Sequence, residues 1–433
     1  MSAGHSIITP TVTPARRPFH LMAKPSGSAC NLDCTYCFYL EKQKLYPDSR
    51  QRMSDEILEA YTRSYLQANP TGQPVVFAWQ GGEPTLLGLD FYRHALALQQ
   101  QYGKGRQIQN TFQTNGTLLT DEWCRFLAEH DFLVGLSLDG PAEIHDRYRL
   151  GKDGKATHAR VLQALELLQQ HRVQYNVLAC VNRLSSQHPL EVYHFLREHG
   201  VEFMQFIPIV ERPAQGQYAQ LGLTHSGPTP LQSAANRTSA TTVQPETMVT
   251  QWSVLPEDYG KFLGTIFAEW VKKDVGRMFV MNFEWALAAY MDAPGAVCVH
   301  QSTCGSAAVI EHNGDVYSCD HYVYPEYRLG NILEKSLTAM LQSPEQSHFG
   351  HAKEDALPQQ CRECKVIKAC WGGCPKQRFT TAANGDAGLN YLCKGYTHFF
   401  TGILPHVKAF AELIRTGRDP AQIMHLQIIS THG

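Results

Sequence analysis

Short apolar runs alternate with amphipathic stretches over the first half of the chain. The apolar runs are rich in β-branched and aromatic residues, and amphipathic segments such as 54–68 and 158–171 repeat their apolar positions at helical spacing. Strands that alternate with helices form right-handed βαβ units, so the pattern predicts an α/β fold with a parallel sheet, as an open or partial barrel. The predicted strands span residues 19–25, 74–80, 109–115, 132–140, 174–182 and 203–210.

Polar and glycine-rich turns follow these strands. They include segments 80–85 (QGGEPT), 113–117 (QTNGT) and 137–141 (SLDGP), and the last two strands end near Asn182 and Pro208. Turns between a strand and a helix are commonly rich in Gly and Asn, so one of them means little. Six in succession converge on the carboxyl edge of the sheet, where parallel α/β folds gather their chemistry, and the sequence therefore predicts a functional site there.

The rest of the chain is divided by composition. Residues 212–250 are rich in Ser, Thr, Gln, Ala and Pro, which predicts a long and partly flexible insertion. Helical patterns resume after it, and most of the cysteines follow. The predicted segments are an N-terminal tail (1–15), the barrel (16–211), the insertion (212–250), a helical connection (251–292), a cysteine-rich domain (293–400) and a C-terminal helical segment (401–433).

Composition indicates a globular protein with an unusual number of cysteines. Of the 433 residues 43% are hydrophobic, and the net charge of −2 predicts no binding of nucleic acid or of an anionic membrane. No apolar run is long enough for a membrane span, and the N-terminus shows no secretory signal, so we expect a cytoplasmic location. Because cytosolic thiols stay reduced, the 13 cysteines favour metal binding over disulfides.

Three cysteines follow the first predicted strand. Cys30, Cys34 and Cys37 have the spacing C-x3-C-x2-C. A structural zinc site that lacks one ligand and a group of redox thiols are two interpretations. The third is a [4Fe–4S] cluster, which usually takes four thiolates. With three thiolates one iron keeps an open coordination position, and by analogy with catalytic zinc such a position predicts a site for a substrate or cofactor.

A second group of eight cysteines lies in the cysteine-rich domain. Two zinc-ribbon sites are one interpretation, but ribbons favour paired C-x2-C knuckles and only one such pair occurs. Cys124 lies in a helical pattern and Cys180 in a predicted strand, and we expect both to be small core residues. The eight are Cys298, Cys304, Cys319, Cys361, Cys364, Cys370, Cys374 and Cys393.

The first cysteine motif, with Tyr36 before its last cysteine, resembles the signature of the radical S-adenosylmethionine (SAM) enzymes. The resemblance implies a partial (βα)6 TIM-type barrel in which SAM binds the open iron and yields a 5′-deoxyadenosyl radical that abstracts hydrogen from carbon. The spacing of the second group resembles the SPASM auxiliary-cluster domain. The fold implied is therefore this barrel followed by a small SPASM domain, with three [4Fe–4S] clusters in all.

The same resemblance implies ligands for these groups. Arg149 matches the residue that holds the SAM carboxylate, and the bidentate fork of Arg suits that task. Gly81, Gly82, Glu83 and Pro84 match the motif at the SAM amino group, Ser137 matches a ribose ligand, and Asn182 and Val210 are further SAM candidates. One auxiliary cluster is implied on Cys298, Cys304, Cys319 and Cys374, and the other on Cys361, Cys364, Cys370 and Cys393.

Motifs along nearly the whole chain resemble the anaerobic sulfatase-maturating enzymes. The resemblance implies oxygen-independent oxidation of a Cys or Ser to formylglycine, in an unfolded sulfatase segment with the motif C/S-x-P/A-x-R. It also implies a flavodoxin- or ferredoxin-type electron donor. The alternatives are a SPASM maturase that forms thioether or C–C cross-links in a ribosomal peptide, and a zinc-ribbon scaffold. The matching segments are 20–42, 79–88, 112–119, 137–146, 316–332 and 370–378.

The implied reaction needs a base and an electron acceptor beside the substrate. Asp320 directly follows Cys319 and by resemblance is the general base, which would benefit from a raised pKa in a dry pocket. A loop cap is the other interpretation of Asp320. Tyr39 and Gln80 are candidates for the substrate site, although aromatic packing explains Tyr39 almost as well. The auxiliary clusters could carry electrons or only shape the site.

Overall fold

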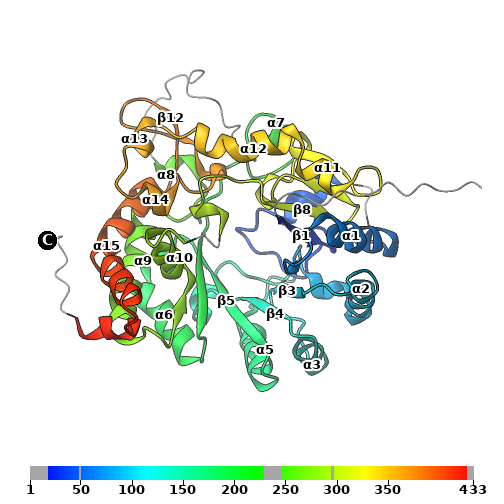
Figure 1. Ribbon diagram of the computed structural model, residues 1–433, viewed down its shortest axis with the longest axis horizontal. Coiled ribbons are helices and arrows are strands. Elements are labelled where there is room, and N and C mark those ends of the chain that lie inside the picture. Colours follow the sequence, from blue (N-terminus) through cyan, green and yellow to red (C-terminus); the bar gives the residue numbers. More distant parts are fainter. Residues whose placement is uncertain (1–17, 48–49, 229–244, 294–296, 427–433) are drawn as a thin grey trace, which may run out of the picture.

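The six predicted strands form the centre of the structure. The computed structural model describes residues 18–47, 50–228, 245–293 and 297–426. Each of the six strands pairs in parallel with the next, which confirms the α/β class and the partial barrel (Figure 1). They are β1 (His20–Lys24), β2 (Val75–Trp79), β3 (Ile108–Thr114), β4 (Leu133–Ser137), β5 (Gln174–Val181) and β6 (Phe203–Pro208).

Amphipathic helices connect successive strands. The side chain of Ser54 caps the first of them by accepting a hydrogen bond from the backbone N–H of Ile57, and that helix buries one apolar stripe. The predicted segments 54–68 and 158–171 correspond to the first and fifth helices. The connecting helices are α1 (Asp55–Ala68), α2 (Leu89–Tyr102), α3 (Asp121–Glu129), α4 (Ala142–His145), α5 (His158–Gln170) and α6 (Pro189–Glu198).

The sheet continues into the cysteine-rich domain. The strand β8 (Ala307–Glu311) pairs in parallel with β1, from His20 opposite Ala307 to Lys24 opposite Glu311. An antiparallel extension follows in β9 (Asp315–Tyr317) and β10 (Arg328–Asn331), while β7 (Phe279–Val280) adds to the far edge beside β6. The ten strands form one sheet in the order β10-β9-β8-β1-β2-β3-β4-β5-β6-β7. The SPASM domain therefore shares its sheet with the barrel.

A glycine turn places the residues that follow β9. Gly314 lies between β8 and β9 with a φ of +87°, a conformation that favours glycine, and its N–H donates to the carbonyl of Glu311 at 2.9 Å. The strand β9 runs antiparallel to β8, and the chain leaves it through Cys319 into the short helix η6 (Asp320–Tyr322). Gly314 is therefore the residue that turns the chain back toward Cys319.

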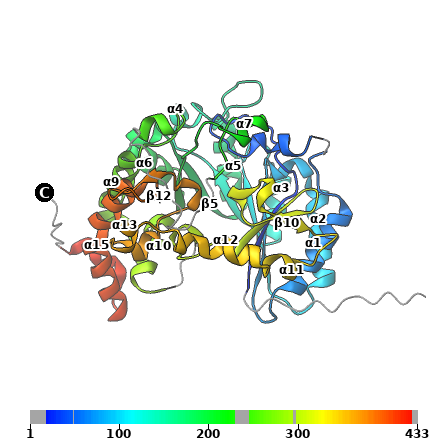
Figure 2. The same cartoon turned by 90° about the horizontal axis from the view of Figure 1, so that it is seen from above.

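Helices of the second half enclose the barrel on two sides. In both views α15 lies beside α9, and α11 and α12 run from that region toward α1 (Figures 1 and 2). The predicted boundary at residue 400 falls inside α15. The elements are α9 (Pro256–Lys273), α10 (Met281–Tyr290), α11 (Leu337–Leu341), α12 (Pro344–Asp355), α13 (Gln359–Arg362), α14 (Ile367–Cys370), α15 (Cys393–Arg415), η9 (Pro420–His425), β11 (Thr380–Thr381) and β12 (Ala387–Leu389).

The predicted insertion is described in part. Residues 229–244, and the predicted tail 1–15, lie outside the described residues. Residues 212–228 contain α7 (Gln217–Gln220), where Tyr218 and Leu223 pack against Tyr324 of the SPASM domain. The short helix α8 (Pro245–Met248) leads back toward α9. Within the described ranges, none of the helices combines the length and the apolar character that crossing a membrane requires.

Gly260 of α9 and Gly395 of α15 bring the two helices into close contact, and this contact generates a stability prediction. A Cβ atom at Gly395 would lie 1.9 Å from the carbonyl oxygen of Pro256, whereas one at Gly402 on the same helix would meet nothing within 4 Å. We expect Gly395→Ala to destabilise the protein by roughly 1–3 kcal/mol through overpacking. As the matched control, Gly402→Ala should stabilise it by about 0.5–1 kcal/mol. Thermal unfolding of both variants checks this, and equal shifts would contradict the close contact.

Candidate active site

The cysteine loop after β1 packs directly against the turn after β2. The N–H of Gly82 donates to the carbonyl of Gly27 at 2.7 Å, and the N–H of Glu83 donates to the carbonyl of Ala29 at 2.8 Å. A Cβ atom at Gly82 would lie 2.0 Å from the Ala29 oxygen, so only glycine allows this approach. The structure therefore brings the predicted SAM motif to Cys30 and its loop, with Gly81 in the same turn at a φ of +149°.

Glu83 joins the ends of β2 and β3. Its side chain is fully buried, and its carboxylate accepts hydrogen bonds from the N–H and hydroxyl of Thr85, the hydroxyl of Thr114 and the N–H of Asn115. Burial raises the pKa of this carboxyl, and the hydrogen bonds oppose that rise. The Asn115 amide in turn lies 3.7 Å from the Cys30 sulfur. Glu83 thus fixes the turn beside the cysteine loop.

The remaining members of this turn lie close by. Pro84 begins the short helix η2 (Pro84–Leu87), whose first turn the Glu83 side chain caps. Gln80 is half-buried, and its N–H donates to the carbonyl of Ala23 at 2.9 Å. At the end of β4, the hydroxyl of Ser137 accepts a hydrogen bond from the Gln113 amide at 3.2 Å. Polar side chains from β2, β3 and β4 therefore gather at one edge of the sheet.

Arg149 is held by an internal carboxylate that the sequence did not reveal. Its Nε donates to Asp139 Oδ2 at 2.9 Å and its Nη2 to Oδ1 at 3.1 Å, while the hydroxyl of Tyr36 also donates to Asp139. The guanidinium holds the pKa of Asp139 below its usual range despite burial. Among the described residues Nη1 of Arg149 makes no hydrogen bond, so one donor stays available. Asp139 lies in the segment SLDG, ten residues before Arg149, and this acidic residue is the signal that was overlooked.

Two cysteines outside the predicted ligand groups differ from each other. Cys124 is fully buried in α3, as predicted for a core residue. Cys180 is only half-buried, and its sulfur lies 3.4 Å from Nη2 of Arg149, so its prediction as a core residue is wrong. Cys180 lies on β5 beside the guanidinium of Arg149, and the pattern of residues along a strand does not reveal such a neighbour.

The later strand ends supply the other predicted SAM residues. Asn182 is fully buried after β5, and its side-chain oxygen accepts hydrogen bonds from the N–H groups of Leu184 and Ser185. Val210 is buried after β6 and lines a cavity of about 130 Å³. His321 and Cys374 of the SPASM domain line the same cavity, which therefore connects the barrel edge with the second cysteine group.

The pKa shifts of the 11 predicted cysteine ligands indicate which of them lie near one another. Burial is the main cause that raises the pKa of Cys30, Cys304 and Cys370 to about 12, and the charges of neighbouring cysteines raise these values further. Such mutual effects require proximity, and among the 11 cysteines they act between members of the same implied set, while the ligand sets themselves stay predictions. The groups are Cys30, Cys34 and Cys37; Cys298, Cys304, Cys319 and Cys374; and Cys361, Cys364, Cys370 and Cys393.

These groups fit iron–sulfur clusters in chemistry and in number. Thiolates are the ligands of such clusters, and a thiol with a raised pKa releases its proton when the metal binds. The first group offers three sulfurs beside the SAM turn, whereas each of the other two offers four. Residues of the first group come from the loop after β1, and the others come from the hairpin and helices of the SPASM domain.

Asp320 lies between the barrel and the SPASM domain. Its Oδ1 is 2.6 Å from the ammonium of Lys24, the last residue of β1. Burial raises the pKa of Asp320, but Lys24, His321 and Lys376 together outweigh it and the pKa lies below its usual value, so the expected raised pKa is wrong. Lys24 comes from a distant part of the chain, and the sequence pattern gave no signal for the pair except a lysine that ends an apolar strand.

Tyr39 belongs to the same buried region. Its ring lies 4.3 Å from the Lys24 ammonium, and its hydroxyl donates a hydrogen bond to the carboxylate of Glu311. Glu311 is opposite Lys24 in the β1–β8 register. Val309 and Tyr317 pack on the Tyr39 ring from the hairpin. Tyr39 therefore makes both aromatic packing contacts and polar contacts.

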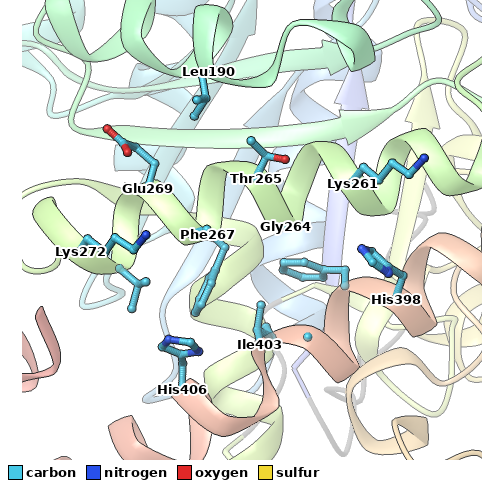
Figure 3. A pocket seen from close by; sticks show the side chains of 14 residues that line it. Leu190, Lys261, Gly264, Thr265, Phe267, Glu269, Lys272, His398, Ile403 and His406 are labelled. Atoms are coloured by element: carbon cyan, nitrogen blue, oxygen red, sulfur yellow. The ribbon is translucent and has the colours of Figure 1, made fainter. Parts of the chain in front are cut away.

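A second hollow lies away from these residues. It is a groove of about 750 Å³ between α9 and α15, lined by apolar side chains and by charged ones of both signs, including Lys272 and Glu269 (Figure 3). None of the predicted site residues lines it, so it is separate from the cysteine groups. Its lining includes Lys261, Phe267, Lys272, His398, Ile403 and His406.

Two family models match the chain. Residues 25–196 match the radical SAM superfamily, and residues 298–365 match an iron–sulfur cluster-binding domain named SPASM. Both matches agree with the geometry, because the first covers the three-cysteine loop and its strands and the second covers the hairpin that joins the barrel sheet.

Curated proteins and solved structures are similar over nearly the whole chain. A serine-type anaerobic sulfatase-maturating enzyme of Bacteroides thetaiotaomicron is 44% identical over 415 residues, 96% of each chain. A cysteine-type enzyme of Clostridium perfringens is 32% identical over 92% of this chain and 100% of the other. The solved structure of native anSMEcpe with bound AdoMet and Cp18Cys peptide matches with a TM-score of 0.77, at 32% identity, over 92% of this chain and 99% of that one.

A more distant structure shares the fold alone. Streptococcus suis SuiB bound to its precursor peptide SuiA matches with a TM-score of 0.53 at 14% identity, over 83% of this chain and 72% of that one. Its likeness supports the barrel with an appended cluster domain and says nothing further of this chain's reaction.

The three thiol groups generate a prediction about iron content. Because the eight SPASM cysteines form two groups of their own, Cys34→Ala should abolish SAM cleavage yet keep about two thirds of the iron of the anaerobically reconstituted protein, or ~8 of ~12 atoms. Cys124→Ala, which changes a buried thiol outside the groups, should keep all of it. Iron analysis and absorbance spectra of both variants measure this. Loss of all iron from Cys34→Ala would contradict three independent groups.

Proposed function

The chain belongs to the anaerobic sulfatase-maturating enzymes of the radical SAM superfamily, and on this premise we propose which residues carry out its reaction. The reaction converts a sulfatase side chain to formylglycine with SAM and three [4Fe–4S] clusters. The observation that carries the assignment of roles is the placement of Asp320. It stands next to Cys319 in the SPASM hairpin and is joined to Lys24 at the end of β1, beside the radical SAM cysteine loop.

We propose serine as a target, within the motif C/S-x-P/A-x-R of an unfolded sulfatase segment. The support is the higher identity to the serine-type relative, 44%, compared with 32% to the cysteine-type relative. A cysteine at the same position would meet the same hydrogen-abstraction geometry, because both side chains carry the reacting hydrogens on Cβ. The preference of this enzyme for serine or cysteine can therefore be tested with two peptides that differ only at the target residue.

The proposed ligands of SAM come from four strand ends. The free Nη1 of Arg149 is available for the SAM carboxylate, while Asp139 and Tyr36 hold the guanidinium in place. The other proposed ligands are Gly81, Gly82 and Pro84, with Glu83 fixing their turn, and Ser137, Asn182 and Val210.

The SAM and iron–sulfur groups, when bound, supply the radical that removes a hydrogen atom from Cβ and the oxidant that takes up one electron. Asp320 accepts the proton of the target hydroxyl or thiol, so that loss of one hydrogen atom, one proton and one electron leaves an aldehyde or a thioaldehyde. Hydrolysis of the thioaldehyde by water gives the aldehyde and hydrogen sulfide. An ionised carboxylate can accept that proton, and the pairing with Lys24 favours the ionised form.

The remaining assignments rest on placement and on the needs of the chemistry. Gln80, half-buried after β2, is proposed as a substrate contact, and Tyr39 as a wall of the site around Lys24. A flavodoxin- or ferredoxin-type protein is the proposed electron donor, because SAM cleavage needs an electron from outside. The proposed setting is the cytosol, where cluster cysteines stay reduced.

A product analysis tests both the reaction and the base. Anaerobic turnover with paired Ser- and Cys-peptides should give the aldehyde mass from the Ser-peptide, with one 5′-deoxyadenosine for each product. Asp320→Asn should lower aldehyde formation by about 10²–10⁴-fold, the usual contribution of a general base. Mass spectrometry measures both. Cross-linked peptide without aldehyde would overturn the proposed function, and normal turnover by Asp320→Asn would exclude this residue as the base.

A further inference from the structure

We infer that Lys24 is a positioning residue for the reaction, which holds the Asp320 carboxylate at the radical SAM loop through a buried ion pair. This inference rests on the proposed function, because it concerns the proposed base. It goes beyond the assignment of Asp320 by naming the group that sets where the base lies.

The ion pair connects two segments that hold different thiol groups. Lys24 ends β1, and its carbonyl accepts a hydrogen bond from the N–H of Gly27 at 3.0 Å where the first cysteine loop begins. Asp320 begins η6, directly after Cys319 of the SPASM hairpin. The distance of 2.6 Å between Nζ and Oδ1 therefore fixes the base relative to the loop where the radical forms.

The ammonium of Lys24 is also held by the ring of Tyr39. The ring face of Tyr39 lies 4.3 Å away, and the Tyr39 hydroxyl is anchored on Glu311, which is opposite Lys24 across the β1–β8 register. A lysine side chain normally has considerable rotamer freedom, and the contacts with Tyr39 and Asp320 restrict it. The ammonium is therefore a fixed point against which Asp320 is oriented.

The exposures of the two partners differ in a way that suits a base. Only 4% of the Lys24 side chain is exposed, compared with 23% of the Asp320 side chain. Oδ2 of Asp320 accepts no hydrogen bond from the described residues. One oxygen of the Asp320 carboxylate is thus held by the ammonium, while part of the carboxylate stays exposed. Proton transfer from a substrate requires such an accessible oxygen.

A second buried lysine of the same kind provides a control. Lys376 of the SPASM domain pairs with Glu211 at 2.6 Å, with 9% and 6% of the two side chains exposed. Its ammonium lies 4.1 Å from the Phe38 ring, much as Lys24 lies over Tyr39. This pair also joins the barrel edge to the SPASM domain. Lys376 makes no direct contact with Asp320 among the described residues, although its charge also lowers the pKa of that carboxyl. The loss of a nearby buried charge can therefore be separated from the loss of the direct contact that Lys24 makes.

The experiment compares variants by the aldehyde formed for each 5′-deoxyadenosine. With a peptide deuterated at Cβ, Lys24→Met should keep SAM cleavage and deuterium transfer to 5′-deoxyadenosine, because the radical side is intact. The aldehyde per 5′-deoxyadenosine should fall by roughly tenfold, equivalent to ~1.4 kcal/mol. Lys24→Arg should recover part of the loss, and Lys376→Met, which removes a nearby charge but no direct contact with Asp320, should lower this ratio much less than Lys24→Met does. Iron content confirms that the clusters persist, and Lys24→Gln replaces Lys24→Met if the latter loses iron.

A double variant decides whether Lys24 acts through Asp320. If it does, adding Lys24→Met to Asp320→Asn should cause no further fall in the ratio, because the two residues work as a unit. An unchanged ratio in Lys24→Met, or a full additional fall in the double variant, would overturn the inference while leaving the proposed function intact. Absence of aldehyde from the unaltered protein would overturn both.

Discussion

The parallel pairing of β1 with β8 is the constraint on which the rest of the structure depends. It makes the barrel and the SPASM domain one sheet, so the hairpin that carries Cys319 and Asp320 has a fixed register against the strand that leads into Cys30. A slip of one residue would turn Lys24 and Glu311 to opposite faces and separate Asp320 from its counter-charge. The cysteine loop after β1 and the proposed base are therefore placed relative to each other by backbone hydrogen bonds, before any ligand contributes.

Buried ion pairs then orient the side chains that the sheet brings close together. Lys24 with Asp320 connects segments that are distant in the chain, whereas Arg149 with Asp139 closes the loop after β4. A buried ion pair adds little net stability compared with well-packed apolar residues, but breaking one is costly because it leaves a charge without a partner. Such pairs therefore favour one arrangement of the site strongly. This is why the guanidinium that would face SAM and the carboxylate that would face the substrate are both held by an opposite charge behind them.

Local pattern predicted the six barrel strands, the cysteine motifs and the glycine-rich turns, because each depends on residues close together in sequence. The strands of the SPASM hairpin escaped notice, since they are short and their sequence was read only as cysteine spacing. Asp320 shows the limit most clearly. Its position after Cys319 was enough to select it, yet its pKa was expected to rise because the sequence does not reveal Lys24 as a neighbour. Cys180 failed for the same reason, since the nearby Arg149 is not visible in a strand pattern.

Native-state hydrogen exchange of the cluster-loaded protein tests the shared sheet most directly. If β1 and β8 are one unit, the amides of Leu21–Lys24 and Ala307–Glu311 should open together, with similar free energies close to that of the barrel core. Exchange of the β8 amides well before those of β1, while β2 to β5 stay protected, would mean that the SPASM hairpin only rests on the barrel. In that case the β1–β8 pairing could not be what places Asp320.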